Sequence, residues 1–249
     1  VNFSYNGDDS RVLKNMTAKF KPGEMIALVG RSGEGKTTVI KVLQRVYDLK
    51  SGQIILDGHN IKDLELYWYR SLFATVQQDV DIFDASLRDN IIYPITGEID
   101  DKIVEKAVRA AHLHVMIDDD ERFADGLDTQ VGERGVRLSG GEKQRVGIAR
   151  AYIALLSGAR FLVLDEATSS LDSESEVAIQ SMIADVRAKQ NISIIVIAHR
   201  LPTIKDADKI LVMEGGQVVE QGDHGQLVNL SGRYAKWVEL QNLNEKNTG

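Results

Sequence analysis

Short, nearly continuous apolar runs are the clearest pattern along the chain. They cover residues 25–29, 161–164 and 192–198 and are rich in isoleucine, valine and leucine. A strand with one face in water alternates apolar and polar residues, whereas a strand covered on both faces does not. Helical periodicity extends over residues 37–46 and 173–189. Strands that alternate with helices in this way predict an α/β fold with a mainly parallel sheet.

Residues 79–157 follow a different pattern. Val104, Ala107, Val108 and Ala111 recur at helical spacing, and no strand-like run interrupts them. Apolar residues three and four positions apart lie on one face of a helix. The segment therefore predicts a mainly helical insertion between two blocks of the α/β core.

Weaker strand patterns flank this core. Residues 16–20 and 53–56 predict short strands of a small antiparallel sheet near the N-terminus. Residues 209–213 and 217–220 lie on either side of Glu214-Gly215-Gly216, a sequence that favours a tight hairpin turn.

Together these patterns predict one domain with an inserted subdomain. Its core, including the small antiparallel sheet, takes residues 1–78 and 158–241, and the helical subdomain takes residues 79–157. Residues 242–249 are polar and predict a disordered tail.

Composition narrows the class of protein. The chain has 249 residues, 43% of them hydrophobic and 27% charged, which is typical of a folded protein with a substantial core. It has no cysteine, which excludes disulfides and cysteine-ligated metal sites. The formal net charge of −7 disfavours nucleic acid as a partner. No run of 18 apolar residues predicts a membrane span. Because Val1 already lies in a strand-like run, we expect the chain to be part of a longer protein.

A phosphate-binding loop follows the first apolar run. Residues 30–37 read G-R-S-G-E-G-K-T and match the pattern G-x-x-x-x-G-K-[ST] between a strand and a helix. Backbone N–H groups of such a loop surround phosphates, and the helix N-terminus adds positive potential. We expect Lys36 to reach the β- and γ-phosphates, the Thr37 hydroxyl to bind Mg²⁺ and Thr38 to contact the α-phosphate. A glycine-rich turn is the alternative, and the flanking strand and helix disfavour it. The residues expected to bind nucleotide are Gly30, Ser32, Gly33, Gly35, Lys36, Thr37 and Thr38.

An acidic pair ends the second apolar run. Asp165 and Glu166 follow directly after it, at the strand end where ligands bind in open α/β sheets. Asp165 is expected to hold Mg²⁺, and Glu166 to act as the general base that polarises the attacking water. Alone the pair is weak evidence, because many strands end in acidic residues, but the phosphate loop strengthens it.

Residues 138–142 read L-S-G-G-E and resemble the signature motif of ATP-binding cassette (ABC) proteins. Ser139, Gly140 and Gly141 match that motif, whereas Glu142 replaces the usual glutamine. Ser-Gly-Gly before a helical run makes a second helix N-terminus suited to an anion. The resemblance implies a RecA-like P-loop NTPase core and a head-to-tail pair of domains, in which each signature contacts the γ-phosphate held by the other domain.

Further positions match motifs of the same family. Tyr5 resembles the aromatic residue that stacks on adenine, with a core tyrosine as the alternative. Gln78 resembles the glutamine that touches Mg²⁺ and the attacking water, and Gln77 is an adjacent competitor. Asp172, in Ser-Ser-Leu-Asp, resembles the residue beside the partner's phosphate loop, and His199 the histidine that bonds the γ-phosphate.

Residues 129–135, T-Q-V-G-E-R-G, resemble a stretch of ABC exporters that contacts the transmembrane domains. The resemblance implies a domain that binds ATP and Mg²⁺, hydrolyses ATP and powers export through fused transmembrane domains at the cytoplasmic face of a membrane. Its expected partners are a second nucleotide-binding domain and those transmembrane domains, and not nucleic acid. A separate ATPase subunit of an importer and a non-transport ABC ATPase are the alternatives. The sequence does not identify the transported substrate.

Overall fold

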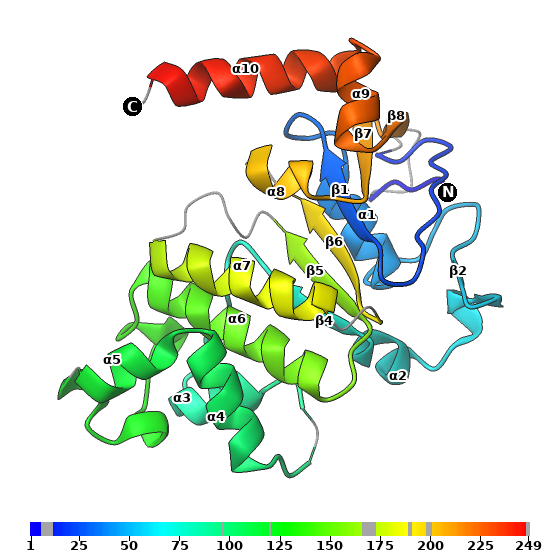
Figure 1. Cartoon of the computed structure of the whole chain (residues 1–249). Coiled ribbons are helices and arrows are strands. Elements are labelled where there is room, and N and C mark those ends of the chain that lie inside the picture. The colour runs from blue at the N-terminus through cyan, green and yellow to red at the C-terminus, as the bar shows by residue number, and fades with distance from the viewer. Residues whose placement is uncertain are drawn as a thin grey trace. The chain divides into compact units, whose positions relative to one another are not determined.

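A computed structural model describes residues 1–5, 12–95, 97–119, 121–165, 173–188, 191–197 and 201–247. The chain divides into two compact units (Figure 1). The first unit comprises Val1–Arg70 and Ser193–Gly249, and the second comprises Ser71–Ile192. The predicted division into a core and a helical subdomain at 79–157 stays a prediction.

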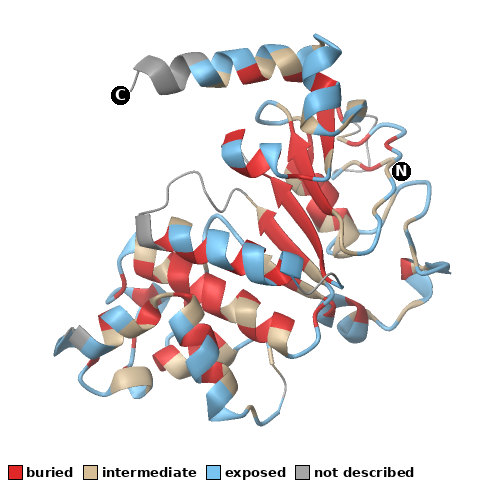
Figure 2. Cartoon of the chain, viewed as in Figure 1, coloured by how far each residue is buried: buried red, intermediate tan, exposed pale blue. Residues whose placement is uncertain are grey.

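A mixed sheet forms the centre of the first unit. Strand β1 lies between β6 and β7 and runs parallel to both, so that Ala27 is opposite Val196 on one side and Ile210 on the other. Every residue of β1 and β6 is buried, as Figure 2 shows in red and as their continuous apolar runs predict. The strands are β1 (Met25–Val29), β6 (Ser193–Ile197), β7 (Lys209–Glu214) and β8 (Gln217–Gly222).

The predicted hairpin is confirmed. Strands β7 and β8 pair antiparallel, with Glu214 opposite Gln217, and a register shift separates Val212 from Met213. Gly215 and Gly216 form the turn with φ of 55° and 77°. Positive φ at both central residues defines the type I′ turn, whose twist matches that of the strands.

Helices complete the first unit. Helix α1 ends at Leu43, three residues before the predicted end at residue 46, because Arg45 takes a left-handed φ of 53° that cannot continue a helix. Helix α10 extends to Asn247 and so occupies most of the stretch for which the sequence predicts a disordered tail. The helices are α1 (Lys36–Leu43), α8 (Leu201–Lys205), α9 (His224–Asn229) and α10 (Arg233–Asn247), with α2 (Leu66–Ser71) ending one residue beyond the unit.

The small antiparallel sheet is shorter than predicted. Among the residues that the structure describes, β2 (Ile55–Leu56) and β3 (His59–Asn60) are the strands that pair there. Described residues 16–20 form no strand, and the N-terminal run contributes isolated bridges from Asn2 to Ser51 and from Phe3 to Leu13. An alternating pattern becomes a strand only when a neighbouring backbone offers a ladder of hydrogen bonds.

The second unit joins a short parallel strand pair to helices. Strand β4, which the sequence analysis missed, pairs with β5. The described residues of 79–157 are mainly helical, and the ladder pairing found among them is a single bridge from Ser86 to Gln130. The elements are β4 (Phe73–Val76), α3 (Leu87–Ile92), α4 (Asp101–Ala110), α5 (Leu113–Asp119), α6 (Gly140–Leu156), β5 (Phe161–Asp165) and α7 (Ser173–Ala188).

Helix α6 lies largely inside the second unit. Most of its residues are buried, including the polar side chains of Glu142, Gln144 and Arg145. Buried polar groups require hydrogen-bond partners, so these side chains are candidates for precise positioning roles. Among the described residues, no helix is long and apolar enough to cross a membrane.

Candidate nucleotide-binding site

The phosphate loop of the first unit connects β1 to α1. The side chain of Lys36 is buried, and its Nζ donates hydrogen bonds to the carbonyl oxygens of Gly30 at 2.8 Å and Arg31 at 2.9 Å. The lysine therefore closes the loop on itself and holds a positive charge within it. Ser32 and Gly33 are exposed at the tip of the loop, where a phosphate group could reach their N–H groups.

The β7–β8 hairpin supports this loop. A Cβ atom at Gly30 would lie only 2.6 Å from the carbonyl oxygen of Met213, so glycine is required at this close approach. At the other side of the loop, the carboxylate of Glu34 accepts a hydrogen bond from the N–H of Gly215. Both contacts use the part of the hairpin next to its turn, which makes the loop part of a rigid framework.

Tyr5 lies against the helix that follows the loop. Its hydroxyl forms a 2.9 Å hydrogen bond with the hydroxyl of Thr38. Its ring packs edge-on against Phe3 and Tyr47, with ring centroids 4.9 Å and 5.2 Å away, and Lys41 Nζ lies 5.9 Å from its centre. The residue is 45% exposed, which excludes the alternative of a buried core tyrosine. Stacking on adenine stays a prediction.

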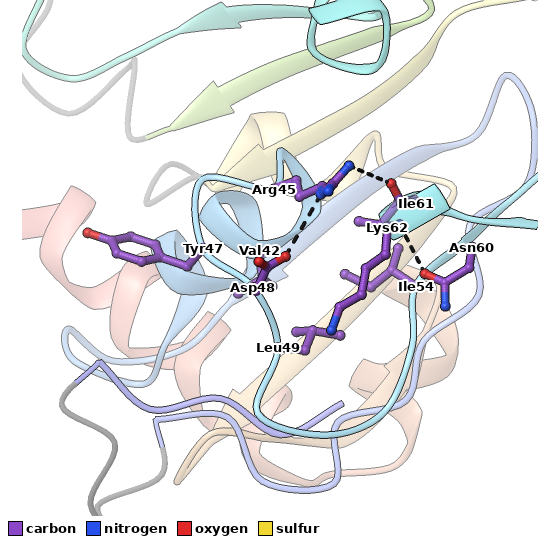
Figure 3. Close-up of a pocket in the computed structure, with 9 residues that line it drawn as sticks. All are labelled: Val42, Arg45, Tyr47, Asp48, Leu49, Ile54, Asn60, Ile61 and Lys62. Carbon is purple, nitrogen blue, oxygen red and sulfur yellow. Dashed lines mark hydrogen bonds and ion pairs between the residues drawn. The ribbon is translucent and has the colours of Figure 1, made fainter. Parts of the chain in front are cut away.

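A small pocket lies at the end of α1, beside the β2–β3 strands (Figure 3). Arg45 donates hydrogen bonds to the carbonyl oxygens of Ile61 and Leu64, both at 3.0 Å, and so fixes the pocket wall. Figure 3 shows Tyr47 turned away from the other lining residues. None of the residues expected to bind nucleotide lines this pocket, so we assign it to the scaffold that carries Tyr47.

The signature motif begins α6 in the second unit. Ser139 is the N-cap, its Oγ accepts a 3.3 Å hydrogen bond from the N–H of Glu142, and its own N–H donates at 2.7 Å to Glu142 Oε2. This reciprocal pair is a capping box, which fixes the first turn of the helix. Ser139 and Gly140 are exposed, so the start of the helix is open to a ligand from outside the chain.

Arg122 completes the surroundings of Glu142. Its Nη2 donates to Glu142 Oε1 at 2.8 Å, and its Nη1 donates to the carbonyl oxygen of Arg137 at 2.9 Å. Burial raises the pKa of the Glu142 carboxyl, but hydrogen bonds from Ser139 and the charge of Arg122 outweigh it, so the pKa lies below its ordinary value. The position at which the signature departs from the family pattern therefore carries a charge with a defined partner.

The two glutamines follow β4. Gln144, buried on α6, donates through Nε2 to the carbonyl oxygen of Gln77 at 3.1 Å and so connects the signature helix to this loop. The side chains of Gln77 and Gln78 are both exposed. The choice of Gln78 as the residue that touches Mg²⁺ and the attacking water stays a prediction.

Residues 129–135 lie beside the start of α3. The N–H of Leu87 donates to Thr129 at 2.9 Å, and the N–H of Val131 donates to Ala85 at 3.1 Å. The segment ends in a 3₁₀ turn, Glu133–Gly135, with Arg134 in a left-handed conformation. Glu133 and Arg134 are exposed, and so is the neighbouring Val136.

Arg150 is a residue that the sequence analysis missed. Its guanidinium donates to the carbonyl oxygens of Asp81 and Asn90 and lies over the rings of Phe83 and Tyr93, with Cζ 5.6 Å and 5.8 Å from their centres. Phe83 and Tyr93 are both exposed apolar side chains. The cation–π contacts with Arg150 fix the positions of these two exposed rings. Its partners lie 60 and 69 positions away in the chain, so no local sequence signal reveals these contacts.

Of the remaining predicted site residues, some lie in the part of the chain that the structure describes and others lie outside it. Asp165 is the last residue of β5. Glu166, Asp172 and His199 lie outside the described residues. Thr37, Gln78 and Asp165 offer the oxygen donors that Mg²⁺ prefers. Among the described residues, no cluster of three or more acidic or histidine side chains could hold a metal.

Comparison with known proteins assigns the family. Residues 13–169 match the family described as ABC transporter. The chain belongs to the ABC transporter family. The family prediction made from the signature and the phosphate loop is thus confirmed, and Glu142 does not set the chain apart from it.

Relatives of this ABC chain are transport proteins by name. It is 46% identical over 241 residues to an ATP-dependent lipid A-core flippase of Idiomarina loihiensis, covering 97% of this chain and 40% of that protein. It is 45% identical over 244 residues to a putative multidrug export ATP-binding/permease protein of Staphylococcus aureus, covering 98% and 40%. The chain therefore spans 40% of the length of these relatives.

A solved structure has the same fold. The structure of a bacterial Atm1-family ABC exporter with ATP bound superimposes with a TM-score of 0.87 at 37% identity, covering 97% of this chain and 40% of that one. The predicted P-loop NTPase fold of this ABC domain is confirmed by that match and by the parallel pairing of its strands.

Proposed function

We propose that this chain is the ATP-binding and ATP-hydrolysing domain of an exporter-type ABC transporter. One observation carries the proposal: the chain has two helix starts suited to phosphate, the loop before α1 and the exposed signature at the start of α6. One nucleotide needs only one of them. The second start gains a use when two domains pair head to tail, so that each signature contacts the nucleotide held by the other.

In this proposal each nucleotide site draws on both domains. Tyr5 stacks on adenine, Lys36 binds the β- and γ-phosphates, and Glu166 accepts the proton of the attacking water while His199 bonds the γ-phosphate. Thr37, Gln78 and Asp165 would hold Mg²⁺, which supplies positive charge beside the transferred phosphoryl group. Ser139, Gly140, Gly141 and Asp172 of the second domain complete the site.

The exposed surface of residues 129–136 with Phe83 and Tyr93 is proposed to bind intracellular helices of transmembrane domains. Backbone hydrogen bonds join residues 85–87 to residues 129–131, and Arg150 supports the two rings, so the surface is held as one piece. The names and greater length of the relatives favour an exporter with fused transmembrane domains, on the cytoplasmic face of a membrane. They disfavour an importer subunit or a non-transport ATPase.

The test is the dependence of ATP hydrolysis on protein concentration. Because each site needs two chains, the rate of phosphate release should rise more steeply than linearly while most chains are monomeric. The Glu166→Gln variant should bind MgATP, hydrolyse it very slowly and elute as a dimer from size exclusion only with ATP. A strictly linear rate over a hundredfold range of concentration, with no ATP-dependent dimer in the variant, would overturn the proposal.

A further inference from the structure

Glu142 introduces an electrostatic conflict at the start of α6. As part of the capping box, its carboxylate stabilises the first turn, and an anion at a helix N-terminus is favourable for the helix itself. In the proposed function, the same turn must approach the γ-phosphate carried by another chain. Like charges repel strongly where they are shielded from water, and the Glu142 side chain is only 8% exposed. Without compensation, the signature would repel its ligand.

Arg122 offers that compensation from outside the signature. It belongs to the 3₁₀ turn Glu121–Phe123 and reaches Glu142 Oε1 at 2.8 Å. Its side chain is 48% exposed, yet its position is fixed by other contacts. Nη1 donates to the carbonyl oxygen of Arg137, and the guanidinium lies 5.3 Å from the ring centre of Phe123, which is buried. An arginine held in this way loses little freedom on pairing with a carboxylate.

The division of the carboxylate oxygens supports this role. Oε2 of Glu142 accepts from the N–H of Ser139, while Oε1 accepts from Arg122. The hydrogen bond from the Ser139 N–H fixes the geometry of the signature, and Arg122 neutralises the charge of the Glu142 carboxylate. A glutamine at this position could accept the same backbone bond but would have no charge to neutralise.

We propose that Arg122 is a positioning residue for the signature motif, which neutralises Glu142 so that Ser139 and the first turn of α6 can accept the phosphate of a nucleotide bound to a second chain. The inference rests on the proposed function. It extends the nucleotide site to Arg122, a residue outside every motif of the sequence. It also predicts that the effects of substitutions at residues 122 and 142 depend on each other.

The experiment compares Arg122→Ala, Glu142→Gln and the double variant with wild type in the 249-residue chain. Arg109→Ala is the control, because Arg109 forms an exposed ion pair with Glu105 on α4 of the same unit. ATP hydrolysis is measured over a range of protein concentrations, together with MgATP binding to the monomer and urea unfolding.

Arg122→Ala should raise the protein concentration needed for half-maximal hydrolysis by about tenfold, with MgATP binding to the monomer unchanged. Glu142→Gln should lose less than Arg122→Ala, and the double variant should recover to within about threefold of the Glu142→Gln variant, since no uncompensated charge remains. Arg122→Lys should recover part of the loss, and Arg109→Ala should behave as wild type.

The outcomes separate the two proposals. If wild type hydrolyses ATP linearly with concentration and forms no ATP-dependent dimer, the proposed function fails. If wild type is cooperative but Arg122→Ala matches Arg109→Ala, or the double variant is as impaired as Arg122→Ala, the positioning role of Arg122 is wrong. Equal losses in unfolding stability and in MgATP binding would assign Arg122 a structural role and also overturn the inference.

Discussion

The helix starts that carry the two phosphate-binding motifs are built in opposite ways. Helix α1 begins after Gly35, which takes a left-handed φ of 93°, and among the described residues no side chain caps its first turn. Its first residue is the buried cation Lys36. Helix α6 begins after Ser139 in an extended conformation, and a capping box with the anion Glu142 closes it.

This difference indicates different uses. A helix start with a glycine N-cap and a buried lysine suits an anion, and in the proposed function that anion is the nucleotide bound by the same chain. A capped start has its geometry fixed before any ligand arrives. The start of α6 therefore suits a phosphate that comes and goes with another chain. The following predictions test this contrast, beginning with the largest effect.

Lys36→Ala should give the largest effect, because it removes the only residue expected to place a full positive charge inside the phosphate loop. We expect MgATP affinity to fall by about a hundredfold or more, and hydrolysis to fall with it. Titration with MgATP and phosphate-release assays measure both. Lys106→Ala, at an exposed position of α4, is the control. Unchanged MgATP affinity in Lys36→Ala would contradict the phosphate-loop assignment.

Ser139→Ala should separate the two helix starts. Loss of an N-cap side chain costs about 1 kcal/mol of unfolding free energy, and the proposed contact with the second chain's phosphate is lost as well. Hydrolysis and ATP-dependent dimerisation should therefore fall, while the monomer keeps its affinity for MgATP. Asp100→Ala removes the equivalent cap of α4, where the side chain accepts from the N–H of Lys102, and should lower stability alone. If Ser139→Ala weakens MgATP binding to the monomer, α6 does not serve a second chain.

Tyr5→Phe tests whether a single hydrogen bond beside the phosphate loop of the first unit contributes to nucleotide binding. The variant keeps the ring but removes the 2.9 Å hydrogen bond to Thr38. A hydrogen bond of this kind contributes about 0.5–1.5 kcal/mol, so the apparent KM for ATP should rise about two- to tenfold. Tyr67→Phe, at an exposed tyrosine of α2, is the matched control. A KM equal to that of wild type would show that the hydroxyl does not position Thr38 for nucleotide.

The smallest effect concerns pH. The pKa of Glu142 lies below its ordinary value of 4.5, so the folded state binds this proton less readily than the unfolded state. Glu142 therefore adds stability above its unfolded pKa, and that stability is lost as the pH falls through the folded pKa. Between neutral pH and about pH 3, Glu142→Gln should lose less unfolding free energy than wild type in urea titrations. An identical pH dependence in wild type and Glu142→Gln would contradict the ion pair with Arg122.

The sequence predicted those parts of the fold that leave a clear local pattern. Continuous apolar runs predicted β1 and β6, and the glycine pair predicted the hairpin, because burial on both faces and a type I′ turn each leave a local signature. Strand β4 was missed because four residues are too short for a clear period. Residues 16–20 were predicted wrongly because pairing depends on a partner strand that local sequence does not encode.

The candidate site also contains residues that the sequence predicts and residues that it does not. The phosphate loop and the signature are contiguous motifs, and the sequence predicts them residue by residue. Arg122 and Arg150 act through contacts with residues far away in the chain, at sequence separations of 20 for Glu142 and 60 for Asn90. A single sequence contains no pattern that links such positions, so their roles are visible only in the folded structure.

The support of the phosphate loop by the β7–β8 hairpin has a consequence for biosynthesis. The hydrogen bond between Glu34 and Gly215 joins residues 181 positions apart. During synthesis the motif is made before the strands that fix its shape, since Gly215 is added 181 positions after Glu34. A nascent chain that already contains every residue of the loop therefore still lacks its framework, and ATP can assist folding only after the hairpin has been made.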